Sequence, residues 1–110
     1  MNFTTASYLL LALAIVSEIL GTSALKASDG MTRLVPALIV VGGYALAFYL
    51  LALTLKTLPV GFVYAIWAGL GVVGVAIVGV LVFGEQMTVA KAAGMALIVG
   101  GVALVHLGTA

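Results

Sequence analysis

The sequence from Thr57 to Gly84 reads TLPVGFVYAIWAGLGVVGVAIVGVLVFG, 28 consecutive residues without a charged side chain. A helix needs about 20 predominantly apolar residues to cross the hydrocarbon core of a bilayer, so this segment is long enough for one span. Its apolar residues are continuous and do not alternate with polar ones, as they would in a strand of a membrane β-barrel. The segment therefore predicts a transmembrane helix.

Three further apolar segments accompany it. Residues 1–25 contain one charged side chain, Glu18, whereas residues 34–55 and 92–110 contain none. The chain is 65% hydrophobic and 6% charged, which is far outside the composition of soluble domains. We expect an all-α integral membrane protein with four transmembrane helices per protomer, folded as a single domain over 1–110. The expected spans are 4–25, 34–55, 59–83 and 89–108.

The connections between these spans are short, so consecutive helices are expected to run antiparallel. An even number of spans puts both termini on one side, and the distribution of Lys and Arg then sets the orientation. The first and third connections hold Lys26, Arg33 and Lys91, against Lys56 and the amino terminus on the other side. This weak bias is compatible with insertion in both orientations, as in an antiparallel dual-topology homodimer. It is equally compatible with one fixed topology.

The size of the chain favours a homodimer independently of topology. Secondary transporters place inverted repeats around a site at the membrane midplane, and this chain holds only one repeat's worth of helices. Two copies would supply the missing half. Gly94, Gly101 and Gly108 recur every seven residues on the expected fourth helix and form a small-residue stripe suited to a dimer contact. The alternative is tight packing of this stripe within one chain.

Glu18 is the only ionisable side chain placed inside an apolar segment rather than at its edge. An ionised carboxylate at that depth costs several kcal/mol, so a glutamate within a span is by default a functional residue. Ala14 and Thr22 lie four residues away on either side and share its helix face. The alternative is a protonated Glu18 that only hydrogen-bonds between helices.

Aromatic side chains lie next to small residues on two other expected helices. Tyr44 and Phe48 share one face of the second helix, and Tyr64 and Trp67 share one face of the third. Trp67 falls in mid-membrane and not at the interface, where Trp usually anchors a helix. Aromatic faces attract desolvated cations by up to about 2 kcal/mol, so together with Glu18 these rings favour a box for large, poorly hydrated cations. Ordinary bundle packing is the alternative.

Such a box predicts a function. Proton and cation would compete for Glu18, and if the site opens to one side at a time, protons entering down their gradient displace the cation outward. We therefore expect a proton-coupled antiporter for hydrophobic cationic small molecules, with membrane lipid around it and no cofactor besides the proton gradient.

Other function classes lack the residues that they need. The chain has no cysteine and only one histidine, His106, so one copy cannot assemble a disulfide, a metal cluster or a catalytic triad. Its net charge of +1 gives no footprint for nucleic acid. An enzyme is not expected, because Glu18 is the only acid or base at membrane depth. His106 is expected at the membrane interface rather than in a proton relay.

Residues 69–74 read GLGVVG and match the G-x-G-x-x-G pattern of dinucleotide sites literally. That fingerprint requires a preceding strand and a following helix within a soluble unit, and this match lies inside an uncharged membrane segment. Gly69 and Gly71 are instead expected to allow a bend in the third helix or the close approach of a neighbouring helix. A bend would suit a helix that rearranges during alternating access, although packing alone also explains the glycines.

Several short motifs carry a resemblance to a known family. They are EILGT at 18–22, Lys26, GMTRLVP at 30–36 and LPVGFVYAIWAGLG at 58–71. On these motifs the chain resembles the small multidrug resistance family of proton-coupled exporters over nearly its whole length. The resemblance implies an antiparallel dual-topology homodimer in a prokaryotic inner membrane, with Glu18 as the shared proton and substrate site. It further implies lining residues Tyr44, Tyr64 and Trp67 and a dimer contact at Gly94 and Gly101.

The family has two main transport subtypes, one exporting bulky quaternary ammonium and aromatic cations, the other guanidinium-type ions. Guanidinium exporters typically carry a Trp three residues after the membrane glutamate, where this chain has Gly21. This difference favours the multidrug subtype. Two positions depart from the common pattern of the family. Ala68 stands where a hydroxyl residue is common, and His106 occupies a late position of the fourth helix that is often Asn in one subtype and basic in the other. A guanidinium-type exporter and a non-transporting accessory membrane subunit remain alternatives.

Overall fold

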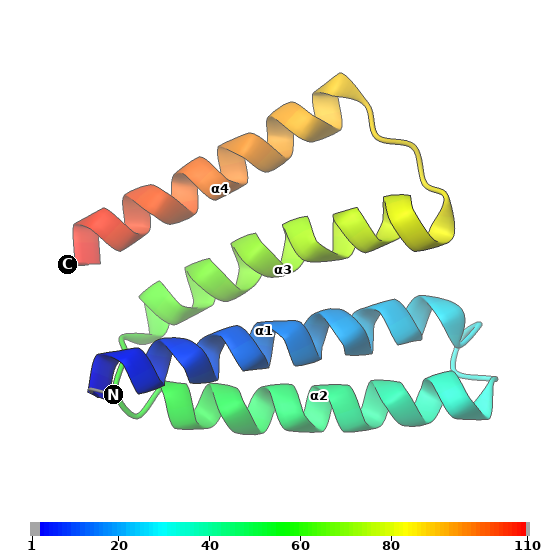
Figure 1. Ribbon diagram of the computed structural model, residues 1–110, viewed down its shortest axis with the longest axis horizontal. Coiled ribbons are helices and arrows are strands. Elements are labelled where there is room, and N and C mark those ends of the chain that lie inside the picture. Colours follow the sequence, from blue (N-terminus) through cyan, green and yellow to red (C-terminus); the bar gives the residue numbers. More distant parts are fainter. Residues whose placement is uncertain (1–2, 110) are drawn as a thin grey trace. The chain divides into compact units, whose positions relative to one another are not determined.

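The computed structural model describes residues 3–109, with side chains described for residues 5–108. Over these residues the chain forms four helices and no strand. The helices are α1 (Phe3–Ala27), α2 (Leu34–Thr54), α3 (Val60–Phe83) and α4 (Val89–Thr109) (Figure 1). Each is long and apolar enough to cross a membrane. The predicted class, an all-α multi-pass membrane protein with four spans, is confirmed, whereas the single packed domain stays a prediction.

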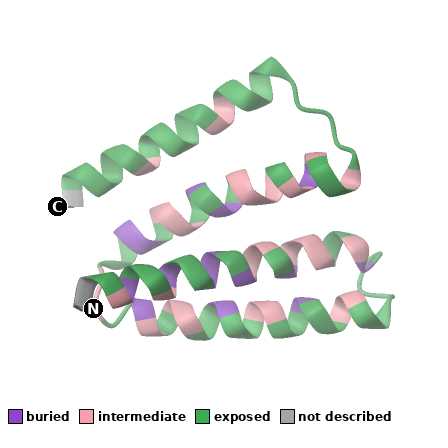
Figure 2. Ribbon diagram, viewed as in Figure 1, coloured by how far each residue is buried: buried purple, intermediate pink, exposed green. Residues whose placement is uncertain are grey.

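The helices form two compact units, one ending at Pro59 and the other beginning at Val60. In the first unit α1 packs against α2, and in the second α3 packs against α4. Most residues of every helix are exposed or half-buried, as the green and pink ribbons of Figure 2 show. Large apolar side chains such as Leu81 and Val89 are among the exposed ones. Such extensive apolar exposure fits helices that lie in lipid.

Two glycines bring the backbones of α1 and α2 together. A Cβ atom built on Gly43 would lie only 3.1 Å from the Cα atom of Gly21 and 3.1 Å from the carbonyl oxygen of Ser17. The glycines therefore let the two backbones touch, which is how small residues promote helix association in membranes. Leu11, Ala14 and Ile15 of α1 are buried on the same hairpin.

Gly69 marks the close approach of α3 and α4. A Cβ atom at this position would lie 2.2 Å from Cγ2 of Val102 and 3.4 Å from Cγ2 of Ile98. Nearer the start of α3, the rings of Phe62 and His106 are in contact, with centroids 5.5 Å apart. Of the two roles that the sequence left open for Gly69, the structure shows close packing, and the bend at Gly69 and Gly71 stays a prediction.

Short connections with several hydrogen bonds reverse the direction of the chain within each unit. After α1, the Ser28 hydroxyl donates to the carbonyl oxygen of Leu25 at 2.7 Å and accepts from the Met31 N–H at 2.9 Å. After α3, Gly84 has a φ of +67°, a left-handed conformation that glycine adopts without strain. The hydroxyl of Thr88 then accepts from the Lys91 N–H at 3.1 Å and caps the start of α4.

Candidate functional site

The carboxyl group of Glu18 lies midway along α1 and is half-buried. Its Oε2 atom is fully buried and, within the described part of the chain, has no hydrogen-bond partner. Among the described residues, no other buried side-chain nitrogen or oxygen atom lacks a hydrogen-bond partner. Buried polar atoms are nearly always hydrogen-bonded, so an unpaired carboxyl oxygen in a membrane span is a candidate binding atom.

The other carboxyl oxygen is held by neighbouring hydroxyl groups. Thr22, one turn further along α1, donates a hydrogen bond from Oγ1 to Glu18 Oε1 at 2.8 Å. The Tyr44 hydroxyl of α2 lies 2.6 Å from the same Thr22 oxygen. The structure thus brings together Glu18, Thr22 and Tyr44, three of the residues that the sequence marked as site residues.

Gly21 makes room for Tyr44 beside α1. A Cβ atom at Gly21 would lie 3.1 Å from Cδ1 and 3.2 Å from Cε1 of the Tyr44 ring. The ring therefore lies directly against the α1 backbone, next to Thr22. Sequence reasoning noted Gly21 but missed Gly43, whose contact with Gly21 holds Tyr44 in this position. The signal that could have pointed to Gly43 is its place immediately before Tyr44, in a Gly42-Gly43 pair.

The remaining predicted lining residues differ in their surroundings. Ala14 is buried on the Glu18 face of α1, whereas Phe48 is 61% exposed on α2. Tyr64 and Trp67 belong to α3 in the second unit, where Tyr64 is 65% exposed and Trp67 is half-buried. Their contribution to a shared site with Glu18 stays a prediction.

The glycine stripe of α4 does not pack against the described residues of α3, its partner in the second unit. A Cβ atom at Gly94, Gly101 or Gly108 would meet no other atom within 4 Å. Within the described residues, none of the α4 span is buried. The stripe therefore makes no close contact with α3, and both its role as a dimer contact and the alternative of packing within one copy stay predictions.

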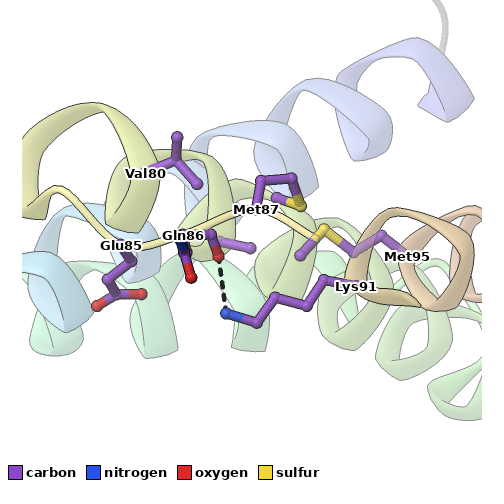
Figure 3. Close-up of a pocket in the computed structure, with 7 residues that line it drawn as sticks. Val80, Glu85, Gln86, Met87, Lys91 and Met95 are labelled. Carbon is purple, nitrogen blue, oxygen red and sulfur yellow. Dashed lines mark hydrogen bonds between the residues drawn. The ribbon is translucent and has the colours of Figure 1, made fainter. Parts of the chain in front are cut away.

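A cavity of about 270 Å³ lies at the connection between α3 and α4 (Figure 3). Its lining is mainly apolar, with polar groups at the connection, and consists of Ala76, Val80, Glu85, Gln86, Met87, Lys91 and Met95. The Lys91 ammonium group donates to the carbonyl oxygen of Gln86 at 2.8 Å. None of the predicted site residues lines this cavity. Nor does any group of three or more His, Asp or Glu side chains that could hold a metal ion occur in the described part of the chain.

Four apolar spans, with a half-buried glutamate inside the first, define a small multi-pass membrane protein that carries a carboxyl group within a span. The chain belongs to the small multidrug resistance family: the family's sequence model, described as Small Multidrug Resistance protein, matches residues 6–98. This confirms the resemblance drawn from the motifs.

Named relatives cover nearly the whole chain. It is 50% identical over 101 residues to the Quaternary ammonium compound-resistance protein QacF of Klebsiella aerogenes, covering 92% of each chain. It is 47% identical over 100 residues to the Quaternary ammonium compound-resistance protein QacE of Escherichia coli, covering 91% of each. Over 102 residues it is 45% identical to the Multidrug resistance protein EbrA of Bacillus licheniformis, covering 93% of this chain and 97% of that one.

Proposed function

We propose that this chain is a proton-coupled antiporter that exports lipophilic cations, often aromatic or quaternary ammonium compounds, with Glu18 binding proton and cation alternately. The observation that carries the proposal is the buried Oε2 atom of Glu18, which has no partner among the described residues. A carboxyl oxygen inside a membrane span is stabilised by a proton or by a bound cation, because either removes an uncompensated buried charge.

Competition at one carboxyl group is sufficient for exchange. A proton neutralises Glu18 and removes the charge that attracts the cation, whereas a bound cation favours the ionised form and repels the proton. The two ligands are therefore negatively coupled, and the coupling acts equally in both directions. If the site faces one side of the membrane at a time, a proton entering from one side drives a cation out on that side.

The substrate class follows from the chemistry of the site and from the relatives. Tyr44 brings an aromatic ring to the hydroxyl group that binds Glu18, and aromatic faces attract cations that have lost their water. Large organic cations lose their hydration most easily, so a carboxylate next to an aromatic ring favours them. Two relatives of this chain are named for resistance to quaternary ammonium compounds and a third for multidrug resistance.

We further propose that two copies assemble in a prokaryotic inner membrane as an antiparallel homodimer with Gly94 and Gly101 at the contact. Both glycines are free of close contacts with α3, which supports this proposal, because a small-residue stripe allows two helices to approach closely in lipid. The transport cycle uses the proton gradient and needs no cofactor, metal ion or enzymatic step.

Transport by proteoliposomes tests the function. Cation uptake driven by a pH gradient is measured with tetraphenylphosphonium and with guanidinium, for the wild type, for Glu18→Gln and for Glu85→Gln as a control with the same chemical change in a connection. We expect uptake of tetraphenylphosphonium that Glu18→Gln abolishes and Glu85→Gln retains. Uptake confined to guanidinium would assign the chain to guanidinium-type exporters. Silence with both cations from folded wild-type protein would overturn the antiporter and leave an accessory subunit.

A further inference from the structure

When Glu18 is ionised, the hydrogen bonds around it have a direction that follows from the number of protons each group can donate. Thr22 Oγ1 lies 2.8 Å from Glu18 Oε1 and 2.6 Å from the Tyr44 hydroxyl oxygen. A hydroxyl group has one proton to donate, and an ionised carboxylate can only accept. Thr22 therefore gives its proton to Oε1, and Tyr44 must be the donor to Thr22. The chain of donation runs from Tyr44 through Thr22 to Glu18.

This arrangement is held by backbone atoms rather than by flexible side chains. The Tyr44 ring lies against Gly21, the residue that precedes Thr22. Gly43, the residue that precedes Tyr44, would bring a Cβ atom within 3.2 Å of the Gly21 backbone nitrogen. Because both partners of the hydrogen bond follow a glycine of this contact, the approach of α1 and α2 fixes the distance between their hydroxyl groups.

The two oxygen atoms of Glu18 are consequently not equivalent. Oε1 accepts from Thr22, whereas Oε2 is buried with no partner in the described residues. A carboxyl group held at one oxygen cannot exchange its two oxygens by rotating about its terminal bond without breaking the hydrogen bond to Thr22. Oε2 is therefore the one carboxyl oxygen of Glu18 whose bonding capacity is unused among the described residues.

We infer that Tyr44 is a positioning residue that acts through Thr22, so that Oε1 stays occupied and Oε2 is the single atom at which proton and cation exchange. The inference rests on the proposed function and adds to it the atom, the donor chain and the reason for strict competition. Both ligands need the same oxygen, so each Glu18 carboxyl group excludes double occupancy, in which proton and cation would cross together and the exchange would be lost.

The direction of donation predicts an order of effects. Thr22→Val removes the donor to Oε1, and hydrogen bonds to charged groups are strong enough that cation affinity should fall roughly ten- to a hundredfold. Tyr44→Phe keeps the ring and leaves Thr22 able to donate, so the fall should be smaller, about two- to tenfold. In the double variant the loss should equal that of Thr22→Val alone, because the hydroxyl groups act in series.

The experiment uses the full chain in lipid nanodiscs and measures tetraphenylphosphonium affinity by calorimetry at one fixed pH. Ser23→Ala is the matched control for Thr22, since the Ser23 hydroxyl donates to the carbonyl oxygen of Ile19 on its own helix. Tyr49→Phe is the control for Tyr44, because Tyr49 is an exposed tyrosine of α2. Both controls should bind as the wild type does, and Thr22→Ser should restore the affinity that Thr22→Val loses.

Infrared difference spectra provide a readout that a merely structural role would not change. The C=O stretching band of protonated Glu18 is assigned by its loss in Glu18→Gln. Its frequency should shift in Thr22→Val and stay unchanged in Ser23→Ala. An unshifted band, or a larger loss of affinity in Tyr44→Phe than in Thr22→Val, would overturn the donor chain. Wild-type affinity in Thr22→Val, together with no binding by Glu18→Gln, would refute the inference and leave the proposed function standing. Wild-type affinity in Glu18→Gln would refute both.

Discussion

The packing of α3 on α4 depends on the missing side chain of Gly69, and Gly69→Ala tests this directly. The new methyl carbon would lie 2.2 Å from Cγ2 of Val102. Carbon atoms in contact normally lie about 3.5–4.0 Å apart, so the two carbon atoms would be roughly 1.3–1.8 Å too close. Val102 cannot avoid the collision easily, because a β-branched side chain in a helix has one strongly preferred rotamer.

The magnitude follows from two opposing effects. Overpacking of this kind typically costs about 1–3 kcal/mol. Alanine is a better helix former than glycine by about 0.5–1 kcal/mol, which offsets part of the cost. We expect Gly69→Ala to lower the free energy of unfolding by about 1–2 kcal/mol, which is a factor of roughly 5–30 in the equilibrium constant.

The assay is unfolding of the purified protein in mixed micelles of increasing SDS content, followed by circular dichroism. Gly61→Ala is the control on the same helix, because a Cβ atom there meets nothing within 4 Å. Adding Val102→Ala to Gly69→Ala removes the colliding methyl group and should recover part of the lost stability. A Gly69→Ala protein as stable as the Gly61→Ala control would refute the reasoning, as would a double variant no more stable than Gly69→Ala alone.

Three further substitutions test other contacts. Gly43→Ala should weaken tetraphenylphosphonium binding, because the new methyl group pushes α2 away from the α1 backbone. The control Gly42→Ala, where a Cβ atom meets nothing within 4 Å, should bind normally. Equal affinities of the two variants in a titration would contradict the close backbone contact. Gly84→Ala should lower the free energy of unfolding by about 1 kcal/mol, because a φ of +67° strains a residue with a Cβ atom. An unchanged midpoint of unfolding in SDS would contradict this. Gly101→Leu should convert a dimer to monomers in light scattering while the helical circular dichroism is kept, and a persisting dimer would remove Gly101 from the proposed contact.

The sequence was informative where a single residue breaks a pattern. Glu18 stands out because no other charge lies inside an apolar segment, and helix periodicity alone puts Thr22 on its face. Tyr44 was predicted as a lining residue from its aromatic ring. Its hydroxyl contact with Thr22 could not be predicted, because that contact depends on the register of two helices, which the Gly21–Gly43 contact sets.

Gly69 illustrates a different limit of sequence reasoning. A glycine inside an apolar helix is compatible with a bend and with close packing, because both follow from the absence of a side chain. Only the position of Val102 on the neighbouring helix distinguishes them, and the sequence does not give that position. The stripe on α4 has the same ambiguity, and the absence of close contacts with α3 at Gly94 and Gly101 leaves both the dimer contact and packing within one copy as predictions.

The central claim is that Glu18 exchanges a proton for a cation, and proton release on cation binding measures this most directly. Tetraphenylphosphonium is added to purified protein in weakly buffered detergent solution, and the pH change is recorded with an indicator dye. The account predicts that the wild type releases protons in proportion to the cation bound and that Glu18→Gln releases none. Cation binding without proton release, or an equal release from Glu18→Gln, would contradict it.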